Sequence, residues 1–335
     1  MTISFDQLTR LENFGHSLSA PSYLFAPEHT NQIPQVFDLA RQHGLTIALR
    51  GAGRSYNDAA LNGGGIVLDF SLLTRILSWD AETGIICAEP GLTLESLWHH
   101  VLPESWWPPV VSGTMKTTLG GCLGMNIHGK NNFKMGTIGE HIIEFTALLP
   151  SGEEVTCSPD KNDDLFYAMI GGLGVLGVFT SVTMQMKRIY SGLLDVHAWN
   201  VPNLQAQLDA LLESAPENDY IVGWLDGTAR GKNIGRGQMH SANYLAKDAD
   251  PNPEKTMRVS YQTLPDKFFG VVPKSSLHYL MRFGFNNLGI WGVNTAKYLV
   301  GRTQTIRQPH AAFHFLLDYV PDWELSYGRQ GLIQY

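Results

Sequence analysis

Two closely spaced glycines, Gly51 and Gly53, mark the loop whose residue types point most directly to ligand chemistry. The loop follows the apolar segment 46–48, which is typical of a buried strand. Glycine permits positive φ and lets the backbone approach a ligand closely, and successive N–H groups in such a turn form a nest that suits a pyrophosphate. Arg54 adds a guanidinium, and the Ser-Tyr pair after it adds hydroxyl groups. An ordinary glycine turn has the same composition, so the loop alone leaves both interpretations open.

A second glycine pattern, Gly-Leu-Gly-Val-Leu-Gly at residues 172–177, satisfies the dinucleotide pattern G-x-G-x-x-G. That pattern has a mechanical meaning only where it follows a strand, opens a helix and precedes an acidic residue by about 20 positions. Here the order is reversed, because residues 163–170 have helical apolar spacing and residues 178–186 alternate like a strand. No Asp or Glu occurs between Gly177 and Leu193. We therefore predict a loop leading into a strand, and no nicotinamide site.

Two more glycine-rich segments lie in the same half of the chain. Residues 112–121 contain Ser-Gly-Thr and Thr-Leu-Gly-Gly, and residues 125–131 read Met-Asn-Ile-His-Gly-Lys-Asn. Three such loops favour a ligand whose long polar body passes close to backbone at several points. An extended dinucleotide fits that description.

The composition sets limits on the class of protein. The chain has 335 residues and a net charge of −7, which gives no electrostatic case for binding nucleic acid. Its three cysteines form no C-x-x-C pair, which favours reduced thiols and a cytoplasmic setting. No apolar run approaches the roughly 18 residues of a membrane span, and no signal peptide is recognisable, so we expect a soluble or peripheral protein. His99 and His100 have no partner at metal-ligand spacing, so we expect no metal site.

The predicted elements mix short strands and helices without regular βαβ alternation, which indicates an α+β fold and not a doubly wound sheet. The character of the sequence changes near residue 190, which predicts two domains, residues 1–190 and 191–335. Helices are predicted at 30–42, 94–101 and 201–212, hairpins at 76–88 and 145–157, and strands at 66–68, 220–225 and 331–335.

At its glycine loops the chain resembles the vanillyl-alcohol oxidase (PCMH) type of FAD-binding fold and, within it, the decaprenylphosphoryl-β-D-ribose oxidases. The resemblance extends from about residue 20 to the last residue. The Ile-His-Gly-Lys-Asn segment is specific to this subfamily, whereas the first glycine loop marks the wider superfamily. The matching segments are residues 50–56, 62–65, 120–121, 127–131, 171–174 and 331–335.

The resemblance implies FAD as the cofactor and assigns its binding to the three loops and one strand. Covalent relatives attach the flavin through a histidine directly after the second glycine, where this chain has Arg54, so we expect FAD to be bound without a covalent link. The implied FAD-binding residues are Arg50, Gly51, Ala52, Gly53, Arg54, Ser55, Tyr56, Asn57, Asp58, Gly113, Thr118, Leu119, Gly120, Gly121, Met125, Asn126, Ile127, His128 and Val178.

The family reaction moves a hydride from C2 of a polyprenyl-phosphate-linked pentose to flavin N5. A short-chain NADH-dependent reductase then completes the epimerisation, which belongs to the synthesis of cell-wall arabinose precursors. The resemblance implies catalytic roles for Lys130, Tyr56, His128 and Gln334, with Lys130 as a cation or proton relay. Two alternatives stay open: an alditol or aldonolactone oxidase acting on a soluble polyol, and a truncated, non-catalytic FAD-binding protein.

The C-terminal half departs from the family pattern. Family members continue beyond the Leu-Ile-Gln-Tyr segment, so we expect an incomplete antiparallel substrate domain after the FAD-binding domain. His314-Phe315 stands where the family usually has an aromatic-His pair near the substrate. The aromatic stretch 268–300 carries scattered Lys and Arg, and either rests on a membrane surface or packs internally.

Overall fold

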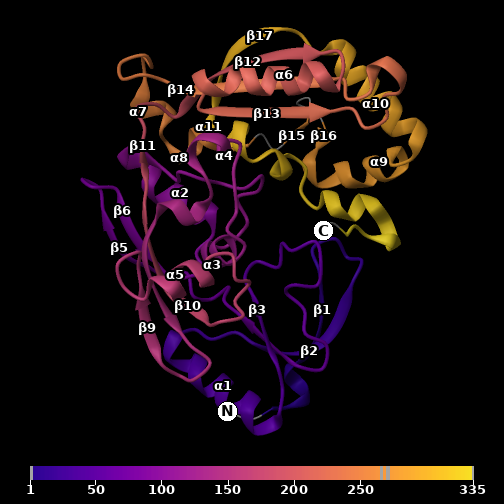
Figure 1. Ribbon diagram of the computed structural model, residues 1–335. Helices are drawn as coiled ribbons and strands as arrows, with labels where there is room; N and C mark the ends of the chain where they lie inside the picture. The colour runs from indigo at the N-terminus through magenta and orange to yellow at the C-terminus, as the bar shows by residue number, and fades with distance from the viewer. Residues whose placement is uncertain (1–2, 265–266, 269–271, 334–335) are drawn as a thin grey trace.

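The computed structural model describes residues 3–264, 267–268 and 272–333, and these residues form the expected α+β fold. Figure 1 shows the first strands and α1 at one end of the molecule and the antiparallel sheet of the second half at the other. The glycine loops lie between these two ends. Residues 334–335, with the predicted catalytic residue Gln334, lie outside the described residues.

The first sheet has the strand order β1-β2-β4-β3, with β4 parallel to both of its neighbours. Helix α1 (Ile33–His43) connects β2 to β3 and buries Ile33, Phe37 and Ala40 against the sheet, as its apolar spacing predicted. It ends at Gly44, whose φ of 62° places the N–H where it donates to the carbonyl of Ala40. The strands are β1 (Leu8–Glu12), β2 (Ser19–Phe25), β3 (Ile47–Arg50) and β4 (Ile66–Asp69).

The second sheet is antiparallel, with the order β5-β6-β10-β8-β9, and contains both predicted hairpins. Helix α2 (Leu94–Val101) packs beside it and starts at Thr93, whose hydroxyl accepts from the N–H of Ser96. The largest buried side chains of this half, Trp98 and Trp107, belong to the same core. The strands are β5 (Ile76–Asp80), β6 (Ile85–Ala88), β8 (Ile142–Leu148), β9 (Glu154–Cys157) and β10 (Val178–Gln185).

The third sheet is antiparallel, with the order β13-β14-β12-β17. One predicted boundary here was wrong: helix α6 begins at Leu204, not at residue 201. Val201 is the last residue of β12, and the side chain of Asn203 accepts from the N–H of Ala206 and so caps the helix. The elements are β12 (Leu193–Val201), α6 (Leu204–Ser214), β13 (Tyr220–Leu225), β14 (Gly237–Tyr244) and β17 (Gln304–Pro309).

Shorter elements connect the sheets and cover the second half. The remaining helices are α3 (Leu119–Gly124), α4 (Asn132–Met135), α5 (Asp163–Met169), α7 (Pro253–Thr256), α8 (Val259–Gln262), α9 (Leu277–Gly284), α10 (Asn287–Val300) and α11 (His310–His314). The short strand pairs are β7 (Trp106–Trp107) with β11 (Lys187–Arg188), and β15 (Lys267–Phe268) with β16 (Val272–Pro273). The 3-10 turns are η1 (Phe5–Gln7), η2 (Thr30–Gln32), η3 (Leu102–Glu104), η4 (Ile138–His141), η5 (Ala215–Glu217), η6 (Gly231–Asn233), η7 (Lys274–Ser276), η8 (Leu316–Tyr319) and η9 (Trp323–Gln330).

Two further sequence predictions have an outcome here. Residues 172–177 form the loop between α5 and β10, as predicted, so this glycine pattern leads into a strand and opens no helix. The strand predicted at 331–335 is reduced, within the described residues, to an isolated parallel bridge between Leu332 and His16. Among the described residues, no helix is long and apolar enough to cross a membrane.

The turn between β6 and α2 gives a test of the packing. A Cβ on Gly91 would come within 1.9 Å of the carbonyl oxygen of Phe70 and 2.6 Å of that of Leu73. Because both are backbone atoms, Gly91→Ala should lower the free energy of unfolding by about 1–3 kcal/mol. Gly227→Ala is the matched control, since a Cβ there meets nothing within 4 Å, and should change stability by less than about 0.5 kcal/mol. Equal urea midpoints for the two variants would contradict this packing.

Candidate cofactor site

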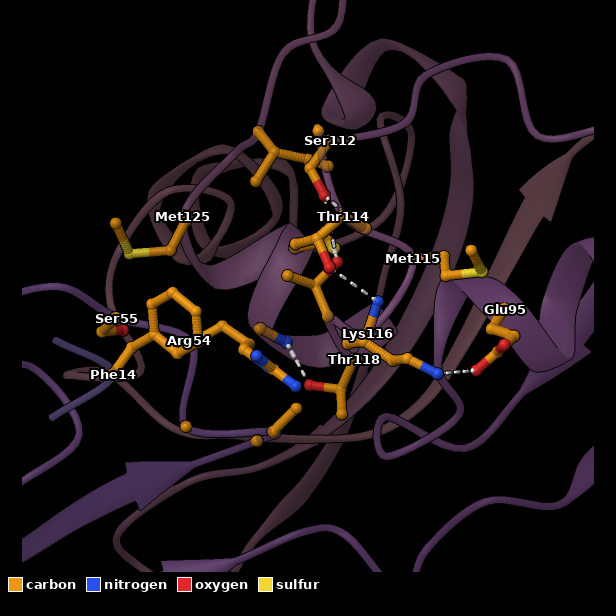
Figure 2. A pocket seen from close by; sticks show the side chains of 18 of the residues that line it. Phe14, Arg54, Ser55, Glu95, Ser112, Thr114, Met115, Lys116, Thr118 and Met125 are labelled. Atoms are coloured by element: carbon orange, nitrogen blue, oxygen red, sulfur yellow. Dashed lines mark hydrogen bonds and ion pairs between the residues drawn. The ribbon is translucent and has the colours of Figure 1, made fainter. Parts of the chain in front are cut away.

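A cavity of 1270 Å³ lies where the three predicted glycine loops meet. It is larger than the roughly 300–1,000 Å³ of a drug-sized ligand site, so it suits a long ligand such as a dinucleotide. Figure 2 shows Arg54, Ser55, Thr114, Thr118 and Met125 gathered from these loops around one space.

The first loop approaches the second closely through its glycines. A Cβ on Gly51 would lie 2.1 Å from Oγ1 of Thr118, so a larger residue would push the two loops apart. Gly53 has a φ of 64°, a conformation that glycine adopts at no steric cost. The side chain of Arg50 holds the start of the loop in place, because its Nη1 donates to the carbonyls of Glu12 and Ala60 at 3.3 Å. Burial lowers the pKa of this guanidinium from its usual range.

The second loop is organised by hydroxyl groups. Oγ1 of Thr118 accepts from the N–H of Gly121 at 3.3 Å and starts α3. The hydroxyl of Thr117 forms a hydrogen bond with the hydroxyl of Ser112 at 3.2 Å and accepts from the thiol of Cys122 at 3.3 Å. Burial raises the pKa of the Cys122 thiol to about 12, so this cysteine stays protonated and does not act as a nucleophile at neutral pH.

Most of the residues proposed for FAD line this cavity, and a few do not. Leu119 is fully buried in the protein core. Asn126 has a φ of 45°, and its side-chain oxygen accepts from the N–H of Gly139 at 3.1 Å. Asp58, Leu119 and Asn126 lie outside the lining, whereas the lining includes Arg50, Gly51, Ala52, Gly53, Arg54, Ser55, Tyr56, Asn57, Gly113, Thr118, Gly120, Gly121, Met125, Ile127, His128 and Val178.

Lys130 lies beyond the lining, at the junction with the third sheet. Its ammonium donates to the carbonyl of Phe313 and, at 3.3 Å, to that of His314. It also lies 4.5 Å from the centre of the Phe313 ring. The backbone carbonyl of Lys130 accepts from the N–H of Ile221 in β13 at 3.0 Å. Burial lowers the pKa of Lys130 to about 8, so the ammonium loses its proton at mildly alkaline pH.

The far wall of the cavity comes from residues that the sequence did not point to. Asp318 accepts from the hydroxyl of Thr114 and from the N–H of Met115, both at 2.7 Å. Glu95, whose N–H donates to the carbonyl of Met115, pairs with Lys116 at 2.7 Å (Figure 2). Asp318 lies 204 positions from Thr114 in the chain, so no local pattern could have linked them.

An aromatic group closes one end of the cavity. The rings of Phe14, Tyr56 and Trp323 lie 5.3–6.3 Å apart, and the guanidinium of Arg54 lies 4.8 Å from the centre of Phe14. The pKa of Tyr56 is raised mainly by burial and to a smaller extent by the nearby carboxylate of Glu324, so its hydroxyl keeps the proton. Glu324 is only 7% exposed, and its Oε2 has no hydrogen-bond partner among the described residues. This carboxylate is therefore an acceptor suited to a ligand hydroxyl or N–H group.

A comparison with known families indicates which ligand this cavity binds. A family described as FAD binding domain matches residues 21–158, the part of the chain that supplies all three glycine loops. The chain carries an FAD-binding domain. The residues fit FAD, because Gly51 and Gly53 line the cavity with backbone and no side chain, and Glu324 supplies an acceptor that has no hydrogen-bond partner among the described residues. Among the described residues, no group of three potential ligands could hold a metal ion.

The relatives of this FAD-binding chain carry the names of oxidases and dehydrogenases. Decaprenylphosphoryl-beta-D-ribose oxidase from Mycolicibacterium smegmatis is 30% identical over 88% of this chain and 64% of its own length. Cytokinin dehydrogenase 10 from Oryza sativa is 28% identical over 70% of this chain and 45% of its own. L-gulonolactone oxidase from Mus musculus is 26% identical over 50% and 37%. The chain is similar to these oxidases and dehydrogenases and spans less than two thirds of the length of each.

Gly53→Val tests the assignment of the cavity to FAD. A β-branched residue does not tolerate the positive φ of this loop, and we expect the purified variant to lose most of its flavin absorbance relative to protein. Gly44→Val is the matched control, because Gly44 has a φ of 62° and ends α1 away from the cavity. That variant should lose stability but retain FAD. Equal flavin content in the two variants would contradict a role of this loop in binding FAD.

Proposed function

We propose that this protein oxidises a secondary alcohol of a sugar, with C2 of a polyprenyl-phosphate-linked pentose as the preferred position. The observation that carries the proposal is the cavity of glycine loops within the matched FAD-binding domain. The choice of substrate is supported by the similarity to decaprenylphosphoryl-beta-D-ribose oxidase, which extends over 88% of this chain and so includes most of its second half.

Bound FAD would supply the two-electron acceptor that alcohol oxidation needs. The chain must hold the alcohol, receive its proton and stabilise the negative charge that develops on oxygen. We assign the last task to Lys130, because its ammonium is largely desolvated at the junction of the two halves. Tyr56 stays protonated and is suited to donate a hydrogen bond. His128 lies on the lining and is assigned to orient the third loop.

The wider setting follows the same resemblance. We propose that residues 1–190 form the FAD-binding domain and residues 191–335 the substrate-binding domain, whose Asp318, Trp323 and Glu324 also line the FAD cavity. A short-chain NADH-dependent reductase would complete the epimerisation in the synthesis of cell-wall arabinose precursors. The protein would act in the cytoplasm or at the periphery of the inner membrane.

A second candidate, oxidation of a soluble polyol or aldonolactone, is favoured by the match to L-gulonolactone oxidase. That match covers only half of this chain, so it supports the FAD-binding part and leaves the substrate side without support. Turnover of L-gulono-lactone or an alditol, with no turnover of a prenyl-phosphate pentose, would favour this candidate. Retention of FAD without turnover of any of these would favour a non-catalytic FAD-binding protein.

The flavin should be dissociable. Arg54 occupies the position at which covalent relatives carry the attaching histidine, and a guanidinium forms no such bond. Acid precipitation of the purified protein should therefore release all yellow colour into the supernatant. Flavin fluorescence that stays with the washed pellet would contradict non-covalent binding.

Lys130→Ala should retain FAD and slow flavin reduction by the substrate about 10²–10³-fold, the typical loss for one charge-stabilising donor. The wild-type rate should fall as the pH rises through about 8, because the ammonium is then deprotonated, and this dependence should disappear in the variant. The measurement is anaerobic stopped-flow absorbance.

Lys134→Ala is the control for Lys130→Ala. Lys134 lies in the same segment and pairs with Asp219 at 2.7 Å, but its side chain is exposed. The substrate should reduce the flavin of the Lys134→Ala variant at the wild-type rate. An unchanged rate and pH profile in Lys130→Ala would remove Lys130 from the proposed mechanism.

A further inference from the structure

Helix α10 contacts the rest of the protein through polar groups. The amide of Asn294 donates to Asp226 at 3.0 Å, and the hydroxyl of Thr295 accepts from Arg236 at 3.0 Å. The carbonyl of Tyr298 accepts from the side chain of Asn200 at 2.8 Å. None of the residues 287–300, all of which the structure describes, is buried. A helix on the surface of a water-soluble domain normally buries an apolar stripe, whereas α10 buries none of its apolar side chains.

The apolar side chains of α10 and of the preceding helix α9 are exposed instead. Figure 1 shows both helices at the edge of the molecule, beyond the end of β13. Exposed apolar groups gathered on neighbouring elements mark an interaction surface, unlike scattered ones. The following residues, each 51–84% exposed, define the α9–α10 face: Tyr279, Leu280, Phe283, Leu288, Trp291, Val293, Leu299 and Val300.

The charged residues of the segment that carries this face are all basic, although Arg307 pairs with Asp195 in β12 and Asp226 accepts from Asn294 of α10. The sequence from 267 to 317 contains six basic residues and no acidic one, although the whole chain has 24 basic and 31 acidic residues. Arg282 and Arg302 are exposed beside the face. A smaller cavity of 540 Å³ adjoins it, lined by Arg282, Arg329 and Gly328 among others. The partner of this face should therefore be apolar and negatively charged. A second copy of the chain fits poorly, because an isologous contact would bring like charges together.

We propose that the α9–α10 face docks on an anionic lipid surface. An apolar face with a tryptophan and flanking basic residues is typical of a helix that lies in the membrane interface. The 14 residues of α10 reach about 21 Å at 1.5 Å per residue, less than the roughly 30 Å of a bilayer core. The helix therefore lies on the membrane and does not span it.

The α9–α10 face is also connected to the FAD cavity. The hydroxyl of Ser326 donates to the carbonyl of His278 in α9 at 3.4 Å, and the ring of Tyr327 lies 5.0 Å from that of Phe285. Ser326 and Tyr327 belong to η9, whose first residue, Trp323, is one of the aromatic residues at the end of the cavity. Docking would thus hold one wall of the cavity beside the lipid surface.

Vesicle sedimentation tests the proposal with the 335-residue chain and requires no turnover, so it is independent of the proposed reaction. The probes are phosphatidylcholine vesicles with and without phosphatidylglycerol. We expect strong binding only where phosphatidylglycerol is present, and weaker binding in high salt. Each of Arg282→Gln and Arg302→Gln should lower the partition coefficient roughly fivefold on the anionic vesicles.

The apolar part of the face is tested by Phe283→Ser combined with Leu288→Ser. This double variant should lose at least about tenfold in binding, because each side chain gains about 1.5–3 kcal/mol when fully buried. Leu212→Ser in α6 is the matched control, since Leu212 is 76% exposed on another part of the surface. It should bind as the wild type does. Thermal unfolding and flavin content of each variant show whether it is folded.

Three results would overturn the proposal. The first is wild-type protein that stays in the supernatant with phosphatidylglycerol vesicles. The second is equal binding to both kinds of vesicle, unchanged by the arginine substitutions. The third is a dimer in solution that the double Ser variant dissociates, which would assign the α9–α10 face to a second copy of the chain.

Discussion

The approach of the first glycine loop to Thr118 is the constraint on which the cofactor site depends. Gly51 comes so close that a Cβ would lie 2.1 Å from the threonine hydroxyl oxygen. The same oxygen accepts from the N–H of Gly121 and starts α3. One small side chain therefore fixes both the separation of the two loops and the start of the helix after the second loop. Glycines of both loops line the cavity beside this contact, and their exposed backbone suits a polar cofactor.

Contacts between distant parts of the chain complete this space. Asp318 ties the second half to the loop at Thr114 and Met115, and Lys130 reaches from the third loop to the carbonyl of Phe313. These contacts have an electrostatic consequence, because the burial that brings the halves together also lowers the pKa of Lys130 to about 8. The features proposed for catalysis therefore require both halves and are not properties of the FAD-binding domain alone.

The second half of the chain exposes apolar side chains on α9 and α10. Asn294 and Thr295 hold α10 to the protein through hydrogen bonds, while Leu288 and Leu299 are exposed. A lipid surface would remove that apolar area from water without requiring a spanning helix. Because η9 connects α9 to Trp323, the proposed docking face and the FAD cavity share one structural element. This arrangement would suit the lipid-linked sugar that we propose as the substrate.

Local structure could be predicted from the sequence, because it depends on neighbouring residues. The end of α1 at Gly44, the start of α2 at Thr93 and the loop at 172–177 follow from caps, periodicity and glycine. The start of α6 was misplaced by three residues, since apolar spacing alone did not reveal that Asn203 caps the helix. The three glycine loops were also evident, and the family resemblance joined them into one FAD site.

Only the tertiary structure decided which other residues complete the site. Asp318, Trp323 and Glu324 lie about 200 positions or more from the loops that they face, and their local sequence shows no motif that requires this. The exposure of the apolar side chains of α10 was equally hidden, because the sequence shows that the helix is apolar but not whether the protein buries it. Sequence specifies backbone preferences over a few residues. Contacts across 200 residues, and the burial that shifts a pKa, exist only once the chain has folded.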